Sequence, residues 1–215
     1  MATDPHRVAV LTGDLVDSTS AGSSQTDLGI ARIQSFAATT STWPDNGAHR
    51  FTRFRGDGWQ FLLPCASLAL RALIGVHAAL RRVEGSPLSR VSIGIGSIEP
   101  VAGSGLSAAS GTALIASGQA LDEIEKSRLF TIAGDGVTPL HRAVIDLVEE
   151  HVQRWTAEQA EATLWFLSPD NPTQKSIAET LQISTQAVHA RLKGAGAHAL
   201  RRAVEAWEAE ESRHD

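Results

Sequence analysis

The spacing of apolar residues predicts the element order βαββαβ in the first part of the chain, followed by one more helix and a short strand. We expect the strands at 7–15, 49–54, 59–63, 90–98 and 128–132, and the helices at 27–42, 66–83 and 112–126. The pair Asp57-Gly58 lies between the second and third strands, and an Asp-Gly pair there is a strong signal for a β-hairpin. Because a hairpin forces antiparallel neighbours, a ferredoxin-like antiparallel sheet of the α+β class fits better than a parallel array.

From residue 140 onward every segment has helical periodicity. A first helix over 140–155 would connect the sheet to a compact helical unit. We therefore predict three parts: a ferredoxin-like α+β domain at 1–136, a connecting helix at 137–156 and an all-α domain at 157–215.

The segment TQKSIAETLQISTQAVHARLKG, residues 173–194, predicts two short helices that cross at a turn. Ile177 and Ala178 form one apolar face, and Val188 and Leu192 form a second. The pattern resembles the helix-turn-helix of bacterial transcription regulators, whose second helix lies in the major groove with its N-terminal residues against base edges. The alternative is a plain helical bundle with solvated basic residues.

Charge supports the helix-turn-helix interpretation. The whole chain has a net charge of −5, but residues 173–202 contain five basic residues against one acidic residue. Gln186 suits a bidentate contact with adenine, and the basic residues suit phosphates. The DNA-contact candidates are Lys175, Ser184, Thr185, Gln186, His189, Arg191, Lys193, Arg201 and Arg202. Such motifs usually read two half-sites as dimers, so we expect a homodimer.

Two aspartates form a second candidate site. Asp14 ends the first predicted strand, and Asp57 lies in a hairpin that an antiparallel sheet would place beside that end. Adjacent carboxylates repel unless a cation separates them, and such oxygen ligands suit Mg²⁺ or Mn²⁺ held with a nucleotide's phosphates. For Asp57 alone, a simple turn role is an equal alternative. The candidates for nucleotide binding are Gly13, Ser18, Thr19, Gly56 and Gly58.

Composition and targeting signals narrow the class of protein. Hydrophobic residues make up 42% and charged residues 20% of the 215 residues, as in ordinary folded proteins. Cys65 is the only cysteine, which excludes an intrachain disulfide and any zinc site with two or four cysteines. We find no signal peptide and no apolar run near the roughly 20 residues that span a bilayer, so we expect a cytoplasmic protein without a membrane partner.

The motifs VAVLTGDLVDST, FRGDGWQFLL, RVSIGIGSIEP and ASGTALIASGQAL resemble the successive core motifs of class III nucleotide cyclase homology domains. With the helix-turn-helix, the whole chain is similar to the SatD-like proteins, which pair such a palm-like domain with a DNA-binding end. The resemblance implies metal binding by Asp14 and Asp57. The asparagine and arginine that active cyclases use fall on Ile115 and Gln119, which implies a degenerate domain that binds a nucleotide without converting it.

Three functions follow from these expectations. The favoured one is a DNA-binding transcription regulator whose cyclase-like domain binds a nucleotide or related ligand and mediates dimerisation. The first alternative is an active cyclase or another metal-dependent phosphoryl-transfer enzyme, with Arg53, Arg55 or a partner subunit supplying the missing cation. The second alternative is a dimerisation or interaction module without catalysis.

Overall fold

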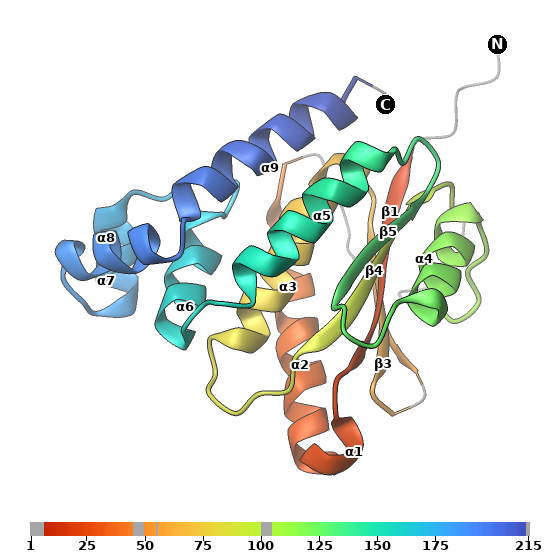
Figure 1. Cartoon of the computed structure of the whole chain (residues 1–215), viewed down its shortest axis with the longest axis horizontal. Helices are drawn as coiled ribbons and strands as arrows, with labels where there is room; N and C mark the ends of the chain where they lie inside the picture. Colours follow the sequence, from red (N-terminus) through yellow and green to blue (C-terminus); the bar gives the residue numbers. More distant parts are fainter. Residues whose placement is uncertain (1–6, 45–49, 55, 100–104, 214–215) are drawn as a thin grey trace.

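The computed structural model describes residues 7–44, 50–54, 56–99 and 105–213. Within them, five strands form one mixed sheet in the order β2-β3-β1-β4-β5 (Figure 1). The strands are β1 (Val8–Leu15), β2 (Arg50–Phe54), β3 (Gly58–Leu63), β4 (Ser89–Gly96) and β5 (Phe130–Gly134).

The first four strands confirm the predicted α+β class. The three pairs that they form with one another are antiparallel, and their order is that of a ferredoxin-like sheet. The fifth strand differs from the expected antiparallel pattern, because β5 pairs parallel with β4. The chain between these two strands crosses over through a helix, and a crossover connection of this kind joins parallel strands.

The helices lie between and after the strands. They are α1 (Ser18–Ala21), α2 (Ser23–Thr39), α3 (Ala69–Arg81), α4 (Thr112–Glu123), α5 (Pro139–Val152), α6 (Ala157–Phe166), α7 (Gln174–Leu181), α8 (Thr185–Gly194) and α9 (Ala197–Glu211), with short 3₁₀ turns at Thr40–Thr42 and Ala66–Leu68. None of the helices in the described ranges is long and apolar enough to cross a membrane.

Helix α3 is buried from Ala69 to Leu80, so it lacks the polar stripe of a surface helix. It packs against α2, against the strands β1 and β4, and against α5, α6 and α9. Helix α4 packs against β1, β4 and β5 (Figure 1). It approaches so closely that a Cβ atom added at Gly94 would lie 2.1 Å from the backbone oxygen of Ala113.

The hydrophobic core is continuous from the sheet into the C-terminal helices. The buried Trp155 follows α5, and its indole N–H donates to the carbonyl of Ala195, 3.0 Å away. Arg81 of α3 donates to the carbonyl of Trp155 at 2.6 Å. The division into domains at residues 136 and 156 stays a prediction.

Candidate functional site

The predicted turn between two short helices is built by caps that the local sequence supplies. The side chain of Thr173 accepts a hydrogen bond from the backbone N–H three residues further on (3.1 Å), and Ser184 does the same at the start of α8 (3.1 Å). Helix α7 ends at Gln182, which has φ 54° in the left-handed region. The N–H of Ile183 then donates to the carbonyl of Ala178 at 3.0 Å, a bond that closes the helix end.

The apolar faces of both helices are buried as the spacing predicts. Ile177 and Ala178 of α7 and Val188 and Leu192 of α8 are all buried. Helix α8 packs on α6, α7 and α9, and the unit lies at one end of the molecule (Figure 1). The opposite side of α8 is therefore turned to solvent.

Residues at the N-terminal end of α8 are exposed. They include Thr185, Gln186 and His189, which we expect to meet base edges, and the cap residue Ser184. Thr185, His189 and Lys193 are spaced by four residues and so lie on one side of the helix. This side presents hydroxyl, imidazole and ammonium groups without a large apolar side chain.

The predicted phosphate contacts divide into two groups. Lys175, Lys193 and Arg202 are exposed. The guanidinium of Arg191 instead pairs with Glu161 at 3.0 Å. Arg201 lies over the ring of Phe166, 3.4 Å from its centroid, and donates to the carbonyl of the same residue.

Burial lowers the pKa of Arg201. Its guanidinium packs between α9 and α6, so the structure does not bring this side chain to the exposed face of α8. Arg191 also has a partner within the fold. Of the five predicted phosphate contacts, the three at positions 175, 193 and 202 are therefore exposed cations.

The second candidate site lies at the ends of β1 and β3. Asp14 stands opposite Gly58 in the strand register, and Asp14 and Asp57 line the same open pocket of about 480 Å³. Ser18 also lines it, and its hydroxyl donates to Oδ2 of Asp57 at 2.5 Å. The structure therefore brings both aspartates and Ser18 together. The side chain of Thr19 is outside what the structure describes.

The three glycines of this region have different roles. A Cβ at Gly13 would lie 2.5 Å from the ring of Trp59, so that glycine makes room for a core side chain. A Cβ at Gly58 would lie 2.8 Å from Phe54. Gly56 has φ 80° with open space around it, so the turn itself requires glycine there.

An arginine that the sequence analysis missed pairs with Asp14 in the same pocket as Asp57. Arg90, opposite Asp14 in the register of β1 and β4, donates from Nε to Oδ1 of Asp14 (2.9 Å) and from a terminal nitrogen to Oδ2 (2.5 Å). These hydrogen bonds, together with the charges of Asp14 and Asp57, raise the pKa of Arg90. The carboxylate of Asp14 thus already has a positively charged partner within the protein, Arg90.

This arrangement bears on the metal centre that the cyclase resemblance implies. Both oxygens of Asp14 are occupied by Arg90, and among the described residues no group of three or more His, Cys, Asp or Glu side chains could hold a metal ion. Mg²⁺ is usually held by one or two carboxylates together with phosphate oxygens and water. With Asp14 paired to Arg90, Asp57 with Ser18 is the part of the pocket that an ion would contact.

Compared with protein-family models and with curated proteins, the chain gives no match in either case. The similarity to class III cyclase domains and SatD-like proteins therefore stays a prediction from the motifs. The geometry of the two sites is what supports a function.

Proposed function

We propose that this protein is a cytoplasmic transcription regulator that binds DNA as a homodimer and places α8 in the major groove. The observation that supports the proposal is the capped α7–α8 pair, with buried apolar faces and an exposed polar end of α8. In this arrangement Ser184, Thr185, Gln186 and His189 meet base edges. Two subunits related by a twofold axis would read two half-sites about one helical turn apart.

The charge distribution supports one orientation on DNA. Lys175 and Lys193 belong to α7 and α8, and Arg202 belongs to the adjoining α9. Past Arg202, α9 exposes the acidic residues Glu205 and Glu210, whereas Glu208 and Glu211 pair with arginines inside the fold. Phosphates attract the exposed cations and are repelled by the exposed carboxylates, so the DNA would lie at the end of the molecule formed by α7 and α8.

Two variants of α8 test the proposal. We expect Gln186→Ala to weaken binding to a selected site by about 1–3 kcal/mol and to relax the preference at one base pair. We expect Lys193→Gln to weaken binding to all sequences alike and to lower the slope of affinity against salt by about one unit. Sites selected from random DNA, followed by anisotropy titrations at several salt concentrations, measure both effects.

Lys126→Gln is the matched control, because Lys126 is an exposed lysine outside α7–α9. It removes the same charge and should leave the salt slope unchanged. Equal slopes for Lys126→Gln and Lys193→Gln, or a random library from which no site is enriched, would contradict the proposal.

A separate observation supports a second function for the sheet domain. Two adjoining open pockets share Ser18 and Asp57, and Gly56 lines one of them. We propose that this region binds a nucleotide together with one Mg²⁺ or Mn²⁺ ion, which Asp57 and Ser18 contact. Arg90 would then attract the phosphates from the other side of the pocket.

We expect Asp57→Asn to weaken the binding of ATP with Mn²⁺ at least about tenfold, because a charge-assisted contact to the ion is lost. Isothermal titration measures the affinity. Asp122→Asn, at an exposed position of α4, is the matched control. Unchanged affinity in Asp57→Asn contradicts the nucleotide site, and a cyclic nucleotide product in the same mixture would favour the enzyme alternative.

A further inference from the structure

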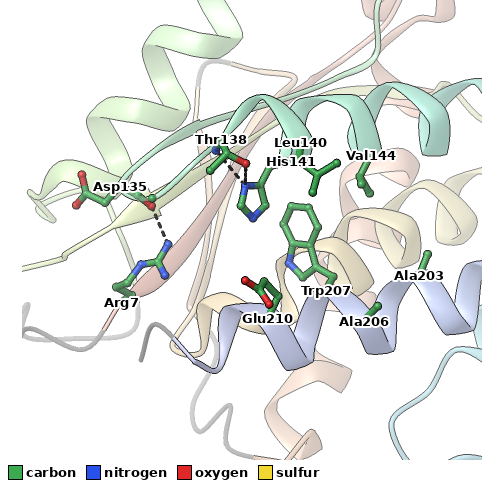
Figure 2. A pocket seen from close by; sticks show the side chains of 11 residues that line it. Arg7, Asp135, Thr138, Leu140, His141, Val144, Ala203, Ala206, Trp207 and Glu210 are labelled. Carbon is green, nitrogen blue, oxygen red and sulfur yellow. Dashed lines mark hydrogen bonds between the residues drawn. The ribbon is translucent and has the colours of Figure 1, made fainter.

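An apolar pocket lies between α5 and α9, away from both sites described above (Figure 2). Its volume is about 950 Å³, within the range of ligand pockets. Leu140 and Val144 of α5 form one wall, and Ala203, Ala206 and Trp207 of α9 form the other. Leu140 is 73% exposed, so this wall of the pocket presents apolar surface to solvent, which a ligand could cover.

Trp207 lines this apolar space and carries a buried polar group without a partner among the described residues. Its side chain is only 7% exposed, and its indole Nε1 has no hydrogen-bond partner among the described residues. Buried tryptophan N–H groups usually have an acceptor, and a buried donor without one destabilises the fold. Figure 2 shows the indole between the two helices, with its nitrogen on the side where His141 and Glu210 lie.

The charges at the pocket restrict the ligand. Arg7 donates to the backbone oxygen of Asp135 at 2.7 Å and pairs with Glu211 at 3.3 Å, so its charge already has partners. Glu211 also contacts His141 at 3.0 Å. Glu210, which also lines the pocket, pairs with Arg213 at 2.8 Å, so the arginines here already have carboxylate partners, which disfavours an anionic ligand.

We propose that the groove between α5 and α9 binds an uncharged aromatic compound that carries one carbonyl or ether oxygen. The ring would lie between Leu140 and Ala206, and the oxygen would accept the hydrogen bond of Trp207 Nε1. The nitrogen is closed off from solvent, so the oxygen reaches it only when side chains of α5 and α9 move apart.

Because binding requires side chains of α5 and α9 to move apart, a ligand in the groove would change how these two helices are arranged. A ligand shifts a protein between two arrangements when it binds one of them better. Helix α5 packs on β5 and α9 packs on α8, so a change in their spacing would move α8 relative to the sheet. An effect of this movement on DNA binding rests on the proposed function, whereas the binding of the ligand does not.

Three probes of similar size test the ligand class on the purified full chain. Acetophenone has a neutral oxygen, ethylbenzene lacks it, and benzoate is an anion. Affinities from ligand-observed NMR titrations should rank acetophenone about three- to tenfold above ethylbenzene, with benzoate weaker than both. No saturable binding of acetophenone, or tighter binding of benzoate, would overturn the proposal.

Three variants locate the site. Ala206→Phe fills the groove from an exposed position and should weaken acetophenone binding at least tenfold, whereas Ala209→Phe, exposed on the same helix but outside the groove, should not. Trp207→Phe keeps an aromatic ring and removes the N–H group, so acetophenone and ethylbenzene should then bind about equally. Wild-type affinity for acetophenone in Ala206→Phe, or an unchanged preference for acetophenone over ethylbenzene in Trp207→Phe, rejects the assignment. Because these measurements need no DNA, failure of the regulator proposal would not affect them.

Discussion

Replacing Arg71 with methionine is expected to lower the free energy of unfolding by about 3 kcal/mol. Arg71 is 7% exposed in α3 and donates to both carboxylate oxygens of Glu208, at 2.6 and 2.8 Å. It also donates to the carbonyl of Leu167 at 2.5 Å. The substitution leaves a part-buried carboxylate and a buried carbonyl without their partner. The side chain of Glu208 is 21% exposed, which keeps the loss at the lower end for broken buried pairs.

Urea unfolding at neutral pH measures this loss. Arg82→Met is the matched control, because Arg82 is exposed at the end of the same helix. The double variant Arg71→Met with Glu208→Leu should recover part of the stability, since it removes both charges together. Equal urea midpoints for Arg71→Met and Arg82→Met would show that the pair of Arg71 and Glu208 does not stabilise the fold.

The second large effect is expected from pH. His77 of α3 is 2% exposed, lies edge-on to Phe130 and Trp155, and has its Nε2 atom 3.2 Å from the carbonyl of Val152. Burial lowers the pKa of His77 to about 4, while the unfolded chain keeps a value of about 6.5. Between these values the unfolded chain binds a proton that the folded protein does not, so stability falls as the pH falls from 6.5 to 4. The loss is about 3 kcal/mol over that window.

The variant His77→Gln keeps a hydrogen-bond donor and removes the titration. Unfolding free energies at pH 7.5, 5.5 and 4.5 should converge between His77→Gln and the wild type as the pH falls, because only the wild type loses this contribution. His189→Gln, at an exposed position of α8, should run parallel to the wild type. Parallel curves for His77→Gln as well would show that the imidazole does not titrate in this way.

Local signals in the sequence were enough to predict the strands of the hairpin and the α7–α8 turn. Alternating apolar residues and an Asp-Gly pair define β2 and β3, and Ser184 caps α8 as its position suggests. The helix expected at 27–42 begins earlier, at Ser23. It follows directly on Gly22, whose φ of 81° separates it from α1. The parallel pairing of β5 follows from the crossover through α4, which the predicted order of elements did not by itself fix.

Contacts between distant positions were not predictable in the same way. Arg90 meets Asp14 only because the register of β1 and β4 aligns residues 76 positions apart. Arg201 lies on Phe166, 35 positions away, although by composition it is one more cation of a basic segment. Sequence spacing indicates that charges are near the surface, but packing decides which of them already have a partner.

Because α3 is covered by elements from both halves of the chain, its burial is complete only late in synthesis. The strands that pack on α3 are present once β4 has followed it, whereas α5, α6 and α9, which also cover α3, come later, and α9 ends only at Glu211. Until then a nascent chain exposes apolar surface of α3, the condition in which newly made proteins associate wrongly or engage chaperones. An early stop codon that removes α9 alone would leave the part of that surface which α9 covers permanently exposed.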